Sequence, residues 1–314
     1  SVIASLLSIL IGLLVGAVLI LIVGVSNKSL GLKSAWEGIR LVLFGLFSTG
    51  RDASGALTFG FNPTSIGNML FRATPLILTG LSVATAFKTG LFNIGAPGQY
   101  LAGTCATLFI ALSIPSEQVS PVIIWLLAFL GGMAAGALWG AIPGMLKALL
   151  NINEVIACIM TNWIAASLVT WLFDISNLKN MVEGNKTGYV YKTTYNGVAT
   201  SKMGLDKLFP GSQVNGGIII AIIMAVLVYI MLEKTTFGYE LKAVGLNKSA
   251  ARYAGINEKK NIILSMAIAG ALAGFGAGLF YLSNVSQWNP LNSTSLPAMG
   301  FNGIAAAFLG GLNP

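Results

Sequence analysis

The sequence predicts an all-α fold: a polytopic bundle of membrane helices with about eight membrane-inserted segments, some of them broken or re-entrant. Two observations carry this prediction. Hydrophobic residues make up 55% of the 314 residues and charged residues only 9%, whereas a soluble chain carries roughly a quarter. The charged residues also leave long gaps, such as 261–314, which contains no Asp, Glu, Lys or Arg. We therefore expect one transmembrane domain over 1–314.

The membrane-inserted segments follow from these charge-free runs. A helix needs about 20 residues to cross the hydrocarbon, and irregular backbone facing lipid is too costly, so each long apolar run is expected to be helical. The first run is too long and too uniformly apolar for a cleaved signal peptide, and we expect it to remain as an anchor. In chain order the expected segments are 2–25, 64–87, 96–114, 122–149, 153–175, 215–232, 261–283 and 298–312.

Glycines recur at every fourth residue in two of these segments. Small residues at this spacing let helix backbones approach closely in lipid. We expect the two stripes to mark helix packing rather than pore lining. Their members are Gly132, Gly136, Gly140 and Gly144 in one segment and Gly270, Gly274 and Gly278 in the other.

Two stretches, 90–99 and 289–303, interrupt the helical pattern inside apolar sequence with glycine, proline and amide residues. Irregular backbone at membrane depth survives only where protein or a water-filled cavity satisfies it. Asn93, Gln99 and Asn302 are therefore candidates for hydrogen bonds to a polar solute near the midplane. A tight loop with capped helix ends is the alternative.

A third polar cluster opens the segment 153–175. Asn153 and Glu154 stand at its start, where a carboxylate also complements the helix dipole, so a structural role is at least as well supported as solute contact. Asn162 and Trp163 lie about two turns inside. A lone amide there costs free energy unless it is paired, and an indole can stack on a planar ligand, so both are candidate solute contacts.

Several functional classes are excluded by what the sequence lacks. It has no histidine, no Cys-x-x-Cys and no nucleophile beside an imidazole base, and Cys105 and Cys158 fall in apolar segments, where we expect buried small side chains. It has no phosphate-binding glycine loop, so the chain should not hydrolyse ATP. The net charge of +8 is scattered among loops, which argues against nucleic-acid binding.

The segment 233–260 is the longest polar stretch compatible with helices. Asn247 or Ser249 can cap a short helix that Gly255 ends, which predicts a compact knob. The residues alone leave two interpretations open: docking into a groove of another protein, or a surface helix lying on the membrane.

Four motifs link the chain to a known family: Gly-Leu-Phe-Asn-Ile-Gly at 90–95, Ile-Asn-Glu-Val at 152–155, Glu-Leu-Lys-Ala-Val-Gly-Leu-Asn at 240–247 and Ala-Ala-Arg-Tyr-Ala-Gly-Ile at 250–256. From about residue 70 to its end, the chain resembles the permeases of bacterial ABC importers of the branched-chain amino acid, ribose and nucleoside group. It is most similar to the nucleoside type, which is linked to basic membrane proteins.

The resemblance implies solute import by alternating access. It implies as partners a separate ATP-binding cassette ATPase that holds ATP and Mg, a second homologous permease subunit and an extracellular solute-binding lipoprotein, with no cofactor, metal or catalytic residue in this chain. Nucleosides are the first choice of solute, ribose-type sugars the second and branched-chain amino acids the third. The pathway would lie at the interface of the two permeases.

The resemblance also implies orientation, which a count of Lys and Arg by loop does not decide. Segment 233–260 becomes the cytoplasmic coupling segment, 176–214 an extracellular segment, and the N-terminus cytoplasmic in a bacterial plasma membrane. The implied ATPase-coupling residues are Glu240, Ala243, Val244, Gly245, Asn247, Ala250, Ala251 and Gly255.

Two departures from the family pattern lie in the expected pathway. The chain has Ala-Pro-Gly at 96–98 where the family usually has Ala-Glu-Gly, and Asn302 where it has Asp, which favours a neutral or differently bound solute.

We also expect residues to be missing at both ends of the chain. A gradient-driven secondary transporter or channel remains an alternative, although Glu154 is the only acid placed to serve it. A purely structural scaffold is a third interpretation.

Overall fold

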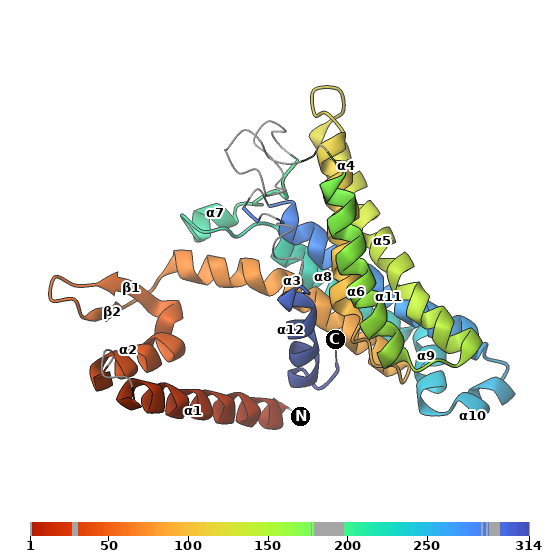
Figure 1. The fold of residues 1–314 in the computed structure, drawn as a ribbon, viewed down its shortest axis with the longest axis horizontal. Helices are drawn as coiled ribbons and strands as arrows, with labels where there is room; N and C mark the ends of the chain where they lie inside the picture. Colours follow the sequence, from red (N-terminus) through yellow and green to blue (C-terminus); the bar gives the residue numbers. More distant parts are fainter. Residues whose placement is uncertain are drawn as a thin grey trace.

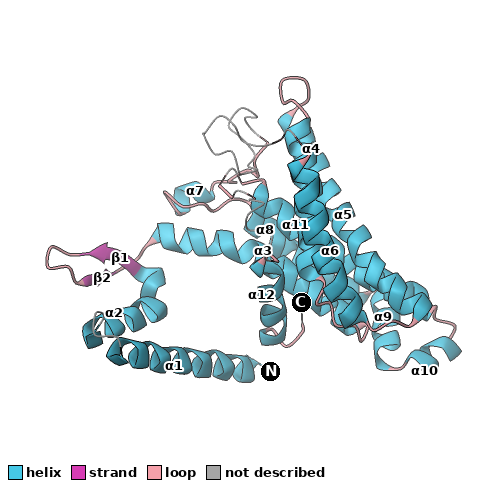
Figure 2. Cartoon of the chain, viewed as in Figure 1, coloured by secondary structure: helices cyan, strands magenta, loops and turns pink. Residues whose placement is uncertain are grey.

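The computed structural model describes residues 2–26, 31–176, 178, 198–283, 285–286, 288 and 296–313. Helices dominate it, and the all-α prediction is confirmed (Figures 1 and 2). The elements in chain order are α1 (Val2–Ser26), α2 (Gly31–Phe44), the 3₁₀ helix η1 (Gly45–Phe47), β1 (Ser48–Arg51), β2 (Leu57–Phe59), α3 (Pro63–Lys88), α4 (Ala96–Ser113), α5 (Pro121–Leu150), α6 (Glu154–Asp174), α7 (Leu205–Leu208), α8 (Gly217–Lys234), α9 (Thr236–Leu246), α10 (Lys248–Tyr253), α11 (Glu258–Tyr281) and α12 (Ala298–Leu309).

Among the described residues, six helices are long and apolar enough to cross a membrane: α1, α3, α5, α6, α8 and α11. The other two expected segments are also helical, as α4 and α12. α12 has only 12 residues and is too short to cross a hydrocarbon layer of about 30 Å, since a helix rises about 1.5 Å per residue. The chain is therefore an integral membrane protein, with six candidate spanning helices in the part of the chain that the structure describes.

The centre of the bundle is a three-helix contact between α4, α5 and α11. A Cβ added to Gly270 would lie 2.9 Å from the carbonyl carbon of Gly136, and one added to Gly274 would lie 3.2 Å from its Cα. On α4, a Cβ on Gly103 would lie 3.0 Å from the carbonyl oxygen of Gly274. The glycine stripes therefore mark backbone-to-backbone packing, as predicted.

A limb formed by α1, α2 and the β1–β2 hairpin extends beside this bundle (Figure 1). Sequence reasoning predicted α1 but neither α2 nor the antiparallel hairpin. Arg51 Nη2 lies 2.8 Å from Glu37 Oε2, which joins the hairpin to α2. In the hairpin loop, the hydroxyl of Ser54 and the N–H of Ala56 lower the pKa of the Asp52 carboxyl below its usual value.

α12 packs against α3 and the start of α4. A Cβ on Gly303 would lie 2.6 Å from Cβ of Thr79, and one on Gly300 would lie 2.5 Å from Cα of Pro97. Thr79 Oγ1 also lies 3.1 Å from the carbonyl oxygen of Met299. The predicted break at 289–303 therefore ends in a helix seated on the bundle, and 289–295 lie outside the described residues.

Candidate functional site: a broken helix and a surface knob

The first predicted break is a tight turn between α3 and α4. The N–H of Gly90 donates to Phe87 O over 2.9 Å and that of Leu91 to Ala86 O over 3.2 Å, so the last carbonyls of α3 are satisfied. Gly90 has a φ of +71°, the left-handed region that glycine adopts without strain. The chain then runs without helix until α4 begins at Ala96.

Asn93 and Gln99 form a buried amide pair across this break. Asn93 Nδ2 donates to Gln99 Oε1 over 2.8 Å, and Gln99 Nε2 donates to Asn93 Oδ1 over 2.9 Å. Asn93 Nδ2 also lies 3.1 Å from Ser82 Oγ on α3. The two residues are 0% and 1% exposed. The pair therefore closes the break with hydrogen bonds from within the chain.

Asn162 attaches α6 to the same break. Its Oδ1 accepts a 2.9 Å hydrogen bond from the N–H of Gly98, and its Nδ2 donates over 3.0 Å to the carbonyl oxygen of Ile94. Asn162 is 2% exposed, and it serves two backbone groups that the break leaves without helical partners. The structure thus brings Asn93, Gln99 and Asn162 together as one amide cluster. Solute contact by these three residues stays a prediction, and it requires them to exchange partners.

Replacing Asn162 by leucine is expected to destabilise the protein. The substitution leaves the N–H of Gly98 and the carbonyl of Ile94 unpaired, at about 1–3 kcal/mol for each buried group. The thermal unfolding midpoint of the detergent-purified protein should therefore fall. Ser167→Leu, the same kind of change on the exposed face of α6, is the control, and an unchanged midpoint for Asn162→Leu would show that the amide is dispensable.

Trp163 lies on a different face of α6 and is 53% exposed. It lies nine residues after Glu154, hence about 14 Å along the helix, near the middle of the span. No hydrogen bond to its indole N–H occurs among the described residues. The open hollow beside it has a volume of about 540 Å³ and is lined by Met160, Trp163, Ile164, Ser167, Leu168 and Trp171.

Asn153 caps α6, and Glu154 forms an ion pair. The side chain of Asn153 accepts a 2.8 Å hydrogen bond from the N–H of Val155, and Glu154 Oε2 lies 2.9 Å from Lys147 Nζ at the end of α5. These contacts favour the structural interpretation of both residues. Asn302 is exposed on α12 and is not part of the amide cluster.

The segment 233–260 folds into the predicted knob, which consists of α9 and α10. Asn247 caps α10 by accepting from the N–H of Ala250 over 3.0 Å, and Gly255, with a φ of +81°, follows its end. The knob lies at the opposite end of the bundle from the loop between α4 and α5 (Figure 1).

The predicted coupling residues divide between the surface and the core of the knob. Asn247, Ala250 and Gly255 are exposed, Ala243 and Gly245 are partly buried, and Glu240 accepts a 3.0 Å hydrogen bond from Asn261 Nδ2. Val244 and Ala251, in contrast, are 1% and 3% exposed and pack into the chain's own interior.

Two exposed apolar residues of the knob, Leu246 and Tyr253, were not among the coupling residues that the resemblance implied. Leu246 is 88% exposed and Tyr253 is 94% exposed. The sequence feature that could have identified them is a large apolar side chain on each side of Asn247 within an otherwise polar segment. Exposed apolar and aromatic side chains within an otherwise polar segment favour a protein contact.

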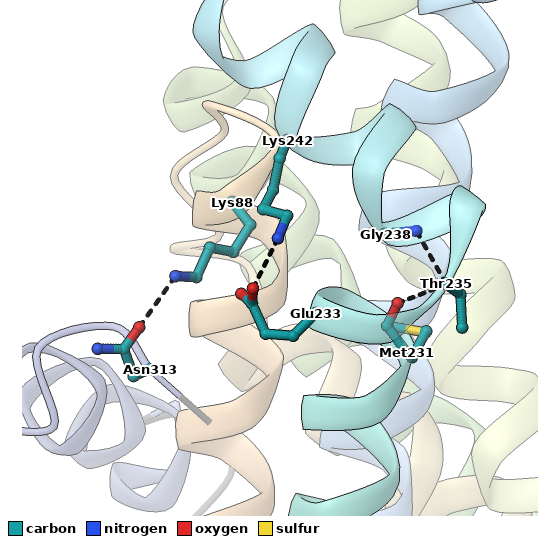
Figure 3. Close-up of polar contacts among 7 residues, drawn as sticks. All are labelled: Lys88, Met231, Glu233, Thr235, Gly238, Lys242 and Asn313. Carbon is teal, nitrogen blue, oxygen red and sulfur yellow. Dashed lines mark hydrogen bonds and ion pairs between the residues drawn. The ribbon is translucent and has the colours of Figure 1, made fainter.

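The corner between α8 and α9 is tightly bonded (Figure 3). Thr235 Oγ1 accepts a 3.1 Å hydrogen bond from the N–H of Gly238 and donates over 2.5 Å to the carbonyl of Met231. Lys242 Nζ lies 2.8 Å from Glu233 Oε2, an ion pair that joins α9 to the end of α8. The corner is therefore fixed at its cap and at a side-chain bridge.

The chain is a polytopic helical bundle with a break between α3 and α4 and a capped knob packed beside that break, an arrangement compatible with a membrane transport permease. The chain belongs to the family described as branched-chain amino acid transport system / permease component, which matches residues 65–314. Permeases of this family are transport components rather than enzymes. No solved structure matches the chain.

Three relatives illustrate the similarity. The nucleoside ABC transporter permease protein NupB of Lactococcus lactis subsp. cremoris (strain MG1363) is 42% identical over 277 residues, covering 82% of this chain and 74% of NupB. The guanosine ABC transporter permease protein NupP of Bacillus subtilis (strain 168) is 36% identical over 312 residues, covering 98% and 78%. The glucose ABC transporter permease protein TsgB13 of Haloferax volcanii is 33% identical over 263 residues, covering 81% and 65%.

Proposed function

We propose that this chain is the transmembrane subunit of an ATP-driven nucleoside importer that works by alternating access. The observation that carries the proposal is the similarity to NupB and NupP, named for nucleoside and guanosine transport, over about three quarters of their lengths. A sugar is the second choice, because TsgB13 is named for glucose. Branched-chain amino acids are the third.

Uptake of radiolabelled guanosine, adenosine, uridine, ribose and leucine by cells with and without this subunit tests the solute class. We expect loss of nucleoside uptake alone. Loss of ribose or leucine uptake instead would transfer the chain to a sister branch of importers, and unchanged uptake of all five solutes would contradict the nucleoside assignment.

The energy source in this proposal is a separate ATPase subunit, which binds ATP and Mg. The sequence has no phosphate-binding glycine loop, so hydrolysis requires a partner. The exposed Leu246 and Tyr253 make the knob a suitable docking surface for it. In this arrangement the knob and the N-terminus face the cytoplasm of a bacterium, and an extracellular solute-binding lipoprotein delivers solute to the opposite face.

The pathway in this proposal runs along the outer face of α6, between this chain and a second homologous permease. Tryptophans that face lipid favour the membrane interfaces, whereas Trp163 lies near mid-span with its indole exposed. An indole N–H facing hydrocarbon lacks a hydrogen-bond partner, so this position favours a solute pathway or a neighbouring protein. The hollow around Ser167 supplies a polar group next to the ring.

Replacing Trp163 by alanine is expected to weaken uptake without loss of assembly. Stacking of a base on an aromatic ring contributes about 1–3 kcal/mol, so the apparent affinity for nucleoside should fall roughly tenfold. Kinetics of radiolabelled uptake measure the change. Trp36→Ala is the matched control, because Trp36 on α2 has a similarly exposed indole, and wild-type kinetics in Trp163→Ala would remove the residue from the pathway.

The competing function, a proton-coupled secondary transporter, finds little support in the charged groups. Such a mechanism needs an ionisable residue free to exchange protons within the membrane. Glu154, the acid placed closest to this role, is held in an ion pair with Lys147.

A further inference from the structure

The end of α9 rests directly on the backbone of the turn between α3 and α4. A Cβ added to Gly245 would lie 2.9 Å from the nitrogen of Gly90 and closer still to the carbonyl oxygen of Lys88. A Cβ added to Gly90 would lie 3.1 Å from the carbonyl oxygen of Gly245. No side chain separates the two main chains here. A displacement of α9 therefore cannot be absorbed by a change of rotamer.

The turn that Gly245 touches leads to the amide cluster within three residues. Gly90 is followed by Leu91, which is 1% exposed, and then by Asn93, which is paired with Gln99. Thr89 is also tied to α11, because its Oγ1 donates to Ser265 Oγ over 2.7 Å. The backbone between Gly90 and Asn93 is thus held at both ends.

One apolar cluster encloses the knob and the turn together. It includes Leu91 of the turn, Val244 of α9, Ala251 of α10, Cys158 of α6 and Met266 of α11, all of them buried. Closely packed interiors transmit displacement instead of deforming locally. The knob is therefore packed against the break between α3 and α4 through buried side chains, in addition to the backbone contact of Gly245 with Gly90.

The opposite end of α9 is attached to α8 and its middle to α11. The Glu233–Lys242 ion pair and the Thr235 cap fix the α8–α9 corner (Figure 3), and Glu240 accepts from Asn261 Nδ2. α9 therefore carries the exposed Leu246 at one end and is attached to α8 and α11 at other points along its length.

We propose that the backbone contact between Gly245 and Gly90 transmits movement of the knob to the amide cluster of Asn93, Gln99 and Asn162, and so couples ATP hydrolysis to opening of the pathway. This inference rests on the ATPase docking proposed above. Gly245 and Gly90 are positioning residues, since neither needs to touch solute or ATPase.

Gly245→Ala in the assembled transporter tests the relay. Alanine favours helix more than glycine does, so any loss arises from the contact rather than from α9 itself. The ATPase should still co-purify, because the exposed docking residues Leu246 and Tyr253 are unchanged. Solute uptake into proteoliposomes should fall about tenfold, within the range typical of coupling between sites. Gly12→Ala is the control, because a Cβ there meets nothing within 4 Å. Wild-type uptake in Gly245→Ala would overturn the relay.

Hydrogen exchange on the wild-type complex provides a second test, which decides the question even where Gly245→Ala does not assemble. A non-hydrolysable ATP analogue should change amide protection in 89–95 together with 243–255. A change confined to 243–255 would overturn the relay. Absence of any co-purified ATPase with the wild-type chain would instead contradict the docking, and the relay with it.

Discussion

Replacing Gly270 by leucine is expected to prevent the bundle from folding. A Cβ at this position would lie 2.9 Å from the carbonyl carbon of Gly136 and 3.1 Å from Cα of Gly140, and both atoms belong to the backbone of α5. The remainder of a leucine side chain has no space unless α5 and α11 separate. Overpacking typically costs about 1–3 kcal/mol, and we expect the upper end or more because backbone cannot move aside as a side chain can.

The yield of monodisperse protein after detergent extraction, followed by the thermal midpoint of any protein recovered, measures this effect. Gly12→Leu is the control, because Gly12 lies on the exposed helix α1 with no neighbour within 4 Å of an added Cβ. A normal yield and midpoint for Gly270→Leu would mean that α5 and α11 do not pack through their glycines.

Replacing both Leu246 and Tyr253 by aspartate is expected to abolish binding of the ATPase while leaving the chain folded. Both side chains project from the knob, at 88% and 94% exposure, so the change does not disturb the interior. Loss of an interface hot spot costs about 2 kcal/mol or more, roughly thirtyfold in affinity. Co-purification of the ATPase with tagged permease measures the result.

Leu208→Asp on α7 is the matched control, since Leu208 is also exposed, at 67%. Normal recovery of the ATPase with the double variant would locate the docking surface elsewhere.

Ala251→Glu is also expected to prevent docking, but by a different route. Ala251 is buried, so a carboxylate at this position would displace α10 from the core. Limited proteolysis should therefore cleave the knob of Ala251→Glu more readily than that of the wild type. The double variant, in contrast, should resist cleavage.

The sequence was most informative where one residue type at one spacing has a single physical use. Glycines four residues apart predicted that each of the two segments packs closely against another helix, and Asn247 or Ser249 with Gly255 predicted the cap and end of α10. Neither prediction required knowledge of distant parts of the chain, because each depends on local geometry and on the absence of a side chain.

The orientation of individual side chains could not be predicted in the same way. A polar residue in apolar sequence needs a partner, but the sequence does not say whether the partner is a solute or another residue. Asn93 and Gln99 pair with each other, and Asn162 with backbone of the break, because α3, α4 and α6 meet there. Similarly, Ala251 of α10 packs inward and Leu246 at the end of α9 faces outward because of how the knob packs on the rest of the bundle, and no local periodicity encodes that.

The α2 helix and the hairpin were missed for a different reason. Their sequence is mixed in charge and rich in glycine, serine and threonine, so it carries neither the long apolar run of a membrane helix nor a clear alternation. The local sequence encodes α2 and the hairpin only weakly. Contacts between them, such as the ion pair of Arg51 with Glu37, join the two elements.

Uptake of radiolabelled guanosine into proteoliposomes that contain this chain, its partner permease and the ATPase is the most direct test of ATP-driven import. We expect uptake that requires ATP on the side of the ATPase, stops with a catalytically inactive ATPase and is insensitive to a protonophore. Uptake that continued without ATP but collapsed on addition of the protonophore would contradict it and would identify a gradient-driven transporter.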